Sequence, residues 1–174
     1  MLLKLKRTPG IYLVGFMGCG KSTVGRALAD EIGWNFVDLD EEIERAQGHP
    51  ISRVFDEQGE TAFREIETAA LRERLKLVDR GRPHVIALGG GAFLSDTNFM
   101  LLKNSGVTVW LDCPFETVEQ RIAGQDHRPL ARDPEKFRAL YESRRTSYAR
   151  AEYRVEGGGD TQTAVRDILA LSLL

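Results

Sequence analysis

The sequence predicts an α/β fold built on a parallel β-sheet. Apolar runs of strand length alternate along the chain with longer segments whose apolar residues follow helical spacing. The central runs are almost continuously apolar, which is typical of strands covered by helices on both faces. The 174 residues, 42% of them hydrophobic, are enough for one core, so we expect a single domain over 1–174.

Five strands and five helices are expected from these patterns. Pro114 and Pro134 mark the expected starts of two helices, because the first turn of a helix needs no amide donor. The residue before each proline, Cys113 or Asp133, can cap the helix with its side chain. The run 157–159 of three glycines predicts a turn before the last helix. The expected strands are 11–14, 35–39, 84–88, 107–111 and 153–155, and the expected helices are 21–32, 61–78, 114–122, 134–150 and 160–171.

Charge and composition exclude several classes of function. The formal net charge of -2 gives no overall basic field for nucleic acid or an anionic membrane. No apolar run approaches the ~20 residues that span a bilayer, and 1–9 lacks a signal-peptide core. Two cysteines and three scattered histidines do not have the spacing of a disulfide or zinc framework. We therefore expect a cytoplasmic protein with small-molecule partners.

A phosphate-binding loop follows the first strand. Residues 15–23, GFMGCGKST, match the P-loop pattern G-x-x-x-x-G-K-[ST]. The match lies between a predicted strand and a predicted helix, as a P-loop requires, and this context favours a P-loop over an ordinary glycine-rich turn. Its amides and the helix N-terminus attract phosphate, Lys21 adds a full positive charge, and the Ser22 hydroxyl is a ligand for Mg²⁺. We expect a nucleoside triphosphate with Mg²⁺ to bind Gly18, Cys19, Gly20, Lys21, Ser22 and Thr23.

Two aspartates close the second predicted strand. Side-chain alternation places Asp38 and Asp40 on the same face, at the carboxyl edge where α/β sheets bind ligands. One carboxylate can hold a magnesium water while the other meets an acceptor hydroxyl, as phosphoryl transfer requires. The alternative is a helix cap plus a solvated acid.

Further candidates for the acceptor side lie on later segments. Arg64 and Glu67 are neighbours on one predicted helix, although a solvated ion pair is an alternative. The glycine run 89–91 leaves bare backbone for a ligand to approach, or forms a loose turn. Either Arg144 or Arg145 could reach back over the sheet edge. Together these residues predict a pocket for a small hydroxy acid, because guanidinium groups recognise carboxylates bidentately.

The polar segment 123–133 lies between two predicted helices. It carries Arg128, Pro129 and Arg132. We expect either a lid over the site or a solvated loop, which is the commoner use of such composition.

Over nearly its whole length the sequence resembles the shikimate kinase family. The resemblance rests on GFMGCGKST, FVDLD, GETAFREIE, LGGG, RPL and a late Arg-x-x-x-Tyr. It implies a P-loop kinase fold with the P-loop at 15–23, a substrate-binding helical segment at about 40–78 and a lid at about 123–133. It also implies transfer of the ATP γ-phosphate to the 3-hydroxyl of shikimate with Mg²⁺, on the route to chorismate and the aromatic amino acids. We expect a monomer.

The resemblance also implies roles for single residues. Asp40 is similar to the aspartate that binds and orients the reacting hydroxyl, and Asp38 lies near magnesium beside Ser22. The catalytic residues would be Lys21, Asp40 and Arg128. The other matches are Gly90 and Gly91 at the substrate, Phe63 and Glu67 in the wall and brace of its pocket, Arg128 of the lid at the transferring phosphate, and Arg121 against adenine.

Two points in the resemblance leave alternatives: which arginine of the late motif binds the carboxylate, and whether the thiol of Cys19 is reactive. Arg64 and Arg144 resemble the family's carboxylate-binding arginines, and Arg144 is preferred over Arg145 by its spacing to Tyr148 alone, since the proline common in this motif is missing. Cys19 replaces the more usual serine. Its thiol should be more reactive than that of Cys113 if the sulfur reaches solvent, and unreactive if the side chain turns inward.

Two other functions are consistent with parts of the sequence. Another small-metabolite P-loop kinase, such as a gluconate kinase, would share the fold and the phosphate loop. A nucleotide-binding regulatory module without catalysis is the second, although the presence of Asp38, Asp40, Arg64 and Arg128 together favours an enzyme.

Overall fold

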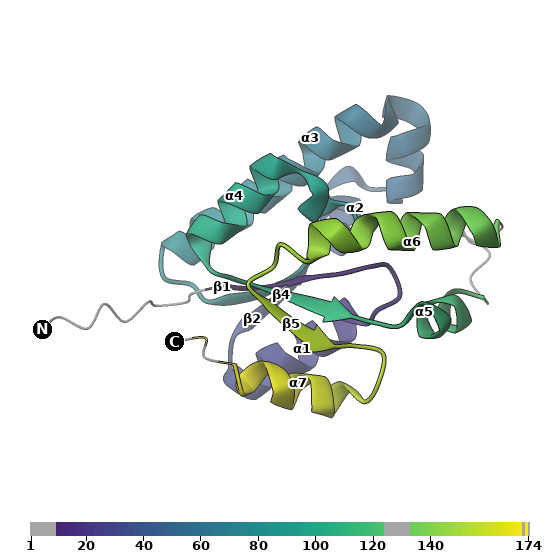
Figure 1. Ribbon diagram of the computed structural model, residues 1–174. Helices are drawn as coiled ribbons and strands as arrows, with labels where there is room; N and C mark the ends of the chain where they lie inside the picture. Colours follow the sequence, from purple (N-terminus) through teal and green to yellow (C-terminus); the bar gives the residue numbers. More distant parts are fainter. Residues whose placement is uncertain (1–9, 124–132, 172, 174) are drawn as a thin grey trace, which may run out of the picture.

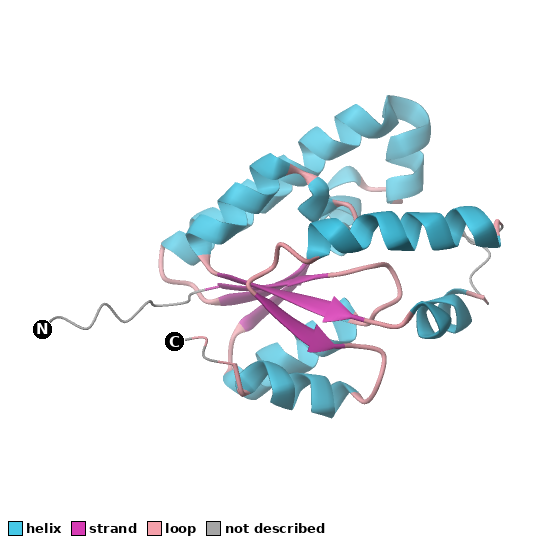
Figure 2. Ribbon diagram, in the orientation of Figure 1, coloured by secondary structure: helices cyan, strands magenta, loops and turns pink. Residues whose placement is uncertain are grey.

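A computed structural model describes residues 10–123, 133–171 and 173. Within them, five parallel strands form one sheet in the order β2-β3-β1-β4-β5, and helices cover both of its faces (Figures 1 and 2). The α/β fold and the five predicted strands are confirmed. The strands are β1 (Gly10–Val14), β2 (Asn35–Asp38), β3 (His84–Ala87), β4 (Val107–Asp112) and β5 (Tyr153–Glu156).

The helices divide into two layers. In Figure 1, α1 and α7 lie together below the sheet, whereas α3, α4 and α6 lie above it. Among the described residues, none of these helices is long and apolar enough to cross a membrane. The helices are α1 (Lys21–Ile32), α2 (Leu39–Gln47), α3 (Ile51–Asp79), α4 (Asp96–Ser105), α5 (Phe115–Ile122), α6 (Pro134–Tyr148) and α7 (Thr161–Leu169), with a 3-10 turn η1 (Ala92–Leu94).

The strand order places the P-loop at the ligand-binding edge. Central strand β1 is fully buried and pairs with β3 on one side and β4 on the other, with Leu13 opposite both Ala87 and Val109. The loop after β1 therefore leaves the sheet between two neighbours whose connections run in opposite directions. In open α/β sheets this crevice is where ligands bind.

Helix α2 was not among the helices expected from the apolar pattern, although it falls within the helical segment at about 40–78 that the family resemblance implies. Only Leu39 and Ile43 of its nine residues are buried, so the apolar stripe is too short to show helical spacing. Its ends do carry signals: the Asp38 side chain accepts from the Glu41 amide at 3.1 Å, and Gly48 ends the helix with φ 74°.

Helix α4 was also missed, for a different reason. Its apolar residues 99–102 are consecutive, which does not distinguish a helix from a short buried strand. The Ser95 side chain, which accepts from the Asn98 amide at 3.3 Å, caps its start. The helix lies in the crossover connection between β3 and β4. Parallel strands need such a connection, which is usually a helix.

The predicted helix 61–78 is the second part of a longer element. Helix α3 begins at Ile51, and Gly59 interrupts it with φ 84° and ψ 172°, a conformation that residues with a side chain avoid. The element therefore consists of two helices that meet at Gly59, and only the second carries the predicted site residues.

The two proline-based helix starts had different outcomes. Pro134 is the first residue of α6, and the Asp133 side chain accepts from the Lys136 amide at 3.2 Å, as expected. The expectation for Pro114 was wrong by one residue. Helix α5 begins at Phe115, Pro114 is the residue before it, and no side chain caps this end.

Candidate active site

A cleft of about 1180 Å³ opens at the carboxyl edge of the sheet. The P-loop, the start of α2, the glycine run after β3 and one arginine of α6 line it together. The predicted site residues that line it are Gly18, Cys19, Gly20, Lys21, Ser22, Thr23, Asp38, Asp40, Gly90, Arg121 and Arg144. Phe63, Arg64, Glu67 and Gly91 are not among the lining residues, although Gly91 lies against Arg64, which pairs with Glu67. Arg128 and most of the segment 123–133 lie outside the described residues.

Glycine backbone and one lysine shape the P-loop. Gly15, Gly18 and Gly20 have φ of 148°, 75° and 91°, which residues with a side chain rarely adopt. The ammonium group of Lys21 donates to the carbonyls of Gly15 at 2.8 Å and Phe16 at 2.9 Å. These bonds hold a positive charge inside the curve of the loop, where phosphate binding needs it.

The Ser22 hydroxyl donates to the Asp38 carboxylate. Asp38 also accepts from the Glu41 amide, so the helix-cap alternative and a role at the site both apply to this residue. Among the described residues there is no group of three or more His, Cys, Asp or Glu side chains suited to a metal ion. A hydroxyl beside one carboxylate nevertheless fits Mg²⁺, which keeps several waters and takes its other ligands from substrate phosphates.

Asp40 faces the cleft from a helix, not from a strand. Strand β2 ends at Asp38, and Asp40 lies in the first turn of α2, so the expectation from strand alternation was wrong, although both carboxylates line the same cleft. The Asp40 Oδ1 atom is buried without a hydrogen-bond partner. Burial, and then the negative charge of Asp38, raise the pKa of Asp40. Asp40 is therefore a better proton acceptor than an exposed aspartate.

Arg64 and Glu67 form an ion pair in which only Glu67 is fully buried. The Arg64 Nη1 atom lies 2.8 Å from Glu67 Oε1, and the side chains of Arg64 and Glu67 are 30% and 1% exposed, so the pair is not fully solvated. Burial raises the pKa of Glu67, and the bond from Arg64 opposes that rise. The ring of Phe63, 3% exposed, packs against Phe55 with centroids 4.6 Å apart. Glu67 thus braces Arg64 beside an apolar wall.

The glycine run 89–91 passes directly against site side chains. A Cβ atom on Gly89 would lie 2.5 Å from Asp40 Oδ1, and one on Gly90 would lie 3.3 Å from Arg144 Nη1. A Cβ on Gly91 would overlap the guanidinium of Arg64. The run therefore packs closely against site side chains and is not a loose turn. Gly89 was not among the predicted site residues.

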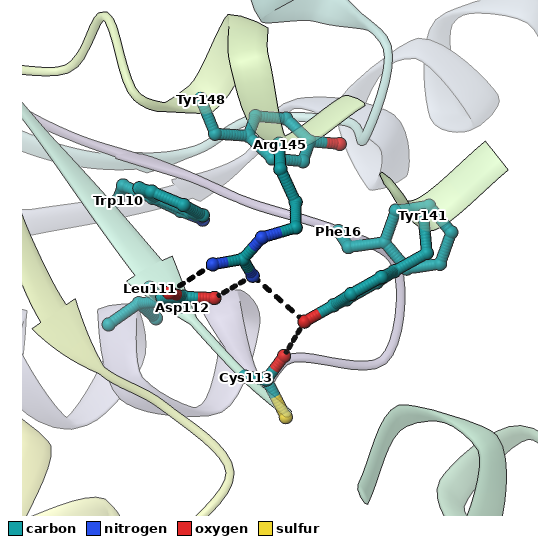
Figure 3. Close-up of a pocket in the computed structure, with 8 residues that line it drawn as sticks. All are labelled: Phe16, Trp110, Leu111, Asp112, Cys113, Tyr141, Arg145 and Tyr148. Carbon is teal, nitrogen blue, oxygen red and sulfur yellow. Dashed lines mark hydrogen bonds and ion pairs between the residues drawn. The ribbon is translucent and has the colours of Figure 1, made fainter. Parts of the chain in front are cut away.

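Arg144 and Arg145 have different surroundings. Arg145 binds Asp112 with both terminal nitrogens, Nη1 to Oδ1 at 2.5 Å and Nη2 to Oδ2 at 2.9 Å, and Figure 3 shows its side chain turned toward that carboxylate. Arg144 lines the cleft, and its Nε atom is buried without a hydrogen-bond partner. The geometry agrees with the choice of Arg144 from its spacing to Tyr148.

Arg121 connects two loops at the other end of the cleft. Its Nη1 donates to the Gly18 carbonyl and its Nη2 to the Gly158 carbonyl, both at 3.1 Å. The guanidinium plane is thereby fixed between the P-loop and the loop before α7. A planar cation held in this way can stack on an aromatic base.

Cys19 does not meet the condition set for a reactive thiol. Its side chain is 1% exposed, and its sulfur lies 3.7 Å from Lys21 Nζ inside the P-loop. Cys113 is equally buried, and burial raises the pKa of its thiol. Cys19 is therefore a small inward-facing side chain in the position of a serine.

We expect neither cysteine of the native protein to react quickly with an alkylating reagent, because a buried thiol is inaccessible. Cys19→Ser should keep its activity and should not slow inactivation by iodoacetamide. Mass spectrometry of labelled peptides checks this. Rapid labelling of Cys19 that ATP with Mg²⁺ prevents would contradict the expectation.

Comparisons with known proteins agree with the geometry of the site. A model of the shikimate kinase family matches residues 17–171. The chain is 42% identical over 150 residues to a shikimate kinase of Persephonella marina, covering 86% of this chain and 89% of that one. It is 42% identical over 171 residues to a shikimate kinase of Cereibacter sphaeroides, covering 95% and 83% of the two chains.

A solved structure is also similar. It is the shikimate kinase of Acinetobacter baumannii in complex with shikimate, with a TM-score of 0.85 and 38% sequence identity. The match covers 94% of this chain and 92% of the other.

Proposed function

Because the chain belongs to the shikimate kinase family, we propose that its cleft binds ATP at the P-loop and shikimate beside Asp40, Arg64 and Arg144. The protein is an ATP-dependent kinase that converts shikimate to shikimate 3-phosphate, a step toward chorismate and the aromatic amino acids. Membership of this family favours shikimate kinase over the alternative of a gluconate kinase. It also favours an enzyme over a regulatory module without catalysis.

The observation that carries the site proposal is a pair of buried, unpartnered polar atoms. They are Asp40 Oδ1, an acceptor, and Arg144 Nε, a donor, and both residues line the same cleft. Buried polar atoms are almost always hydrogen-bonded, and at a cleft a ligand group can supply the missing partner. A hydroxyl would meet Asp40, and a carboxylate would meet Arg144.

The proposed roles follow from charge and position. Asp40 would accept a hydrogen bond from the reacting hydroxyl, orient it and take its proton, and burial, which raises its pKa, strengthens it as a base. Lys21 would stabilise negative charge on the phosphates. Arg64, braced by Glu67, would bind the carboxylate together with Arg144.

Mg²⁺ is the proposed cofactor. When bound, it would neutralise charge on the phosphates of ATP. Ser22 would be its direct protein ligand through the hydroxyl, and Asp38, which that hydroxyl already contacts, would hold its water.

The remaining parts of the proposal concern the boundaries and surroundings of the site. We propose a single kinase domain with the P-loop at 15–23, the substrate-binding segment at about 40–78 and a lid at about 123–133, whose Arg128 would reach the transferring phosphate. Arg121 would lie against adenine. The protein would act as a cytoplasmic monomer without nucleic-acid or membrane partners, in line with its net charge of -2.

ADP release in a coupled assay tests the function. With ATP and Mg²⁺, release should depend on shikimate and should be at background level with gluconate, quinate and nucleoside monophosphates. Equal release with gluconate, or none with shikimate, would contradict the assignment.

Arg64→Ala and Arg144→Ala should each raise the KM for shikimate about 30-fold, because a lost bond to a charged group costs about 2 kcal/mol. The KM for ATP should stay within about twofold, since neither residue belongs to the P-loop. Steady-state kinetics with each substrate varied in turn measures both values. Arg166→Ala, which removes an exposed arginine of α7, is the matched control. A parallel rise in both KM values would instead indicate damage to the whole site.

A further inference from the structure

We propose that Arg145 is a positioning residue: its ion pair with Asp112 fixes helix α6 so that the guanidinium of Arg144 faces the shikimate carboxylate. The inference rests on the proposed role of Arg144. It assigns a function to the neighbouring arginine, which does not itself line the large cleft.

The pair between Arg145 and Asp112 is well placed to fix a helix. Asp112 ends strand β4, is 8% exposed and receives both terminal nitrogens of Arg145. Arg145 Nη1 also donates to the Tyr141 hydroxyl at 2.9 Å, and that hydroxyl donates to the Cys113 carbonyl at 2.6 Å. Figure 3 shows this chain of bonds running from α6 to the end of β4. Two side chains one turn apart on α6 are thus joined to the last residue of β4 and to the residue that follows it.

Arg144 depends on this attachment because the side chain that hydrogen-bonds to it belongs to the same helix. Its Nε has no hydrogen-bond partner, its side chain hydrogen-bonds to that of Tyr148 at the end of α6, and its guanidinium carbon lies 5.8 Å from the centre of the Phe16 ring. The position of Arg144 therefore follows the backbone of α6. Successive residues of a helix point about 100° apart, so fixing Arg145 against Asp112 also fixes the direction in which Arg144 projects.

The chain contains a matched control for this role. Arg154 contacts the same carboxylate, with Nη2 2.6 Å from Asp112 Oδ2, and the same ring of Trp110, at 5.2 Å compared with 4.9 Å for Arg145. Arg154 lies on β5, however, not on α6. A change at Arg154 disturbs Asp112 and Trp110 without releasing the helix that carries Arg144.

The first test replaces each fork-shaped guanidinium by a single ammonium group. Arg145→Lys keeps the charge but loses the bidentate bond, so it should raise the KM for shikimate about tenfold, since displacements of about 1 Å are enough for such losses. The KM of Arg145→Lys for ATP and the melting temperature of this variant should stay near the wild-type values. Arg154→Lys should leave the KM for shikimate unchanged. An equal rise for both lysine variants would overturn the proposal, because the effect would then belong to Asp112 in general.

The second test is a double-mutant cycle with Arg144→Ala. If Arg145 acts through Arg144, Arg145→Lys should have no further effect on the KM for shikimate once Arg144 is alanine. The same tenfold rise in both backgrounds would overturn the positioning role and leave the role of Arg144 intact. If Arg144→Ala alone leaves the KM unchanged, the proposed role of Arg144 fails, and the positioning role fails with it.

Discussion

Asp40→Asn is expected to lower turnover by at least about 100-fold while ATP still binds, because the variant loses the group that takes the proton and orients the hydroxyl. The amide is nearly the same size as the carboxylate, so the cleft should keep its shape. Turnover from the coupled assay and ATP binding by calorimetry give the two values. Near-normal turnover would remove Asp40 from the mechanism.

The same variant should be more stable than the wild-type protein at neutral pH. Burial and the charge of Asp38 raise the pKa of Asp40 in the folded protein. A carboxyl group with a raised pKa favours folding when protonated, and this contribution is lost as the pH rises through the folded-state pKa. The gain in melting temperature of Asp40→Asn should therefore be larger at pH 7 than at pH 4. Thermal unfolding at the two pH values measures it, and an equal gain at both would contradict the proposed cause.

Gly89→Ala should also reduce turnover by about 100-fold, through the geometry of Asp40. The added methyl group would lie 2.5 Å from Asp40 Oδ1 and 3.1 Å from its Cγ, so the carboxylate would have to turn away. The melting temperature should change little, because the end of a side chain moves more easily than backbone.

Gly90→Ala provides the graded comparison for this prediction. Its nearest contact would be Arg144 Nη1 at 3.3 Å, which a small shift relieves, so turnover should fall much less. Equal losses for the two variants would indicate that the loop itself, and not its contact with Asp40, is what matters.

Local sequence patterns were sufficient for the sheet and for the phosphate loop. Each strand is a compact apolar run. The loop 15–23 follows a fixed pattern because its glycines allow the backbone to curve around phosphate and Lys21 supplies the positive charge. The two helices that the apolar pattern did not predict have few buried residues, Leu39 and Ile43 in α2 and Asn98 and Leu102 in α4. Their caps, Asp38 with Glu41 and Ser95 with Asn98, were the signals that could have revealed them.

Residues whose roles depend on contacts across the fold were harder to predict. Asp112 is a single acid at the end of an apolar strand, and nothing nearby in the sequence indicates that Arg145 and Arg154 both bind it. Gly89 could not be distinguished from its glycine neighbours until Asp40 was placed beside it. The choice of Arg144 over Arg145 could be argued from spacing because Tyr148 lies on the same helix, where spacing along the chain determines spacing in space.

The strand order has a consequence for how the protein folds. Residue 10 of β1 pairs with residue 84, and residue 11 with residue 107, so both neighbours of the central strand come from much later in the chain. Large loops must close before these pairings form, which makes such topologies slow to fold compared with helical bundles. During synthesis β1 leaves the ribosome well before its partners. Until those partners appear, its apolar segment GIYLV is open to mispairing and aggregation.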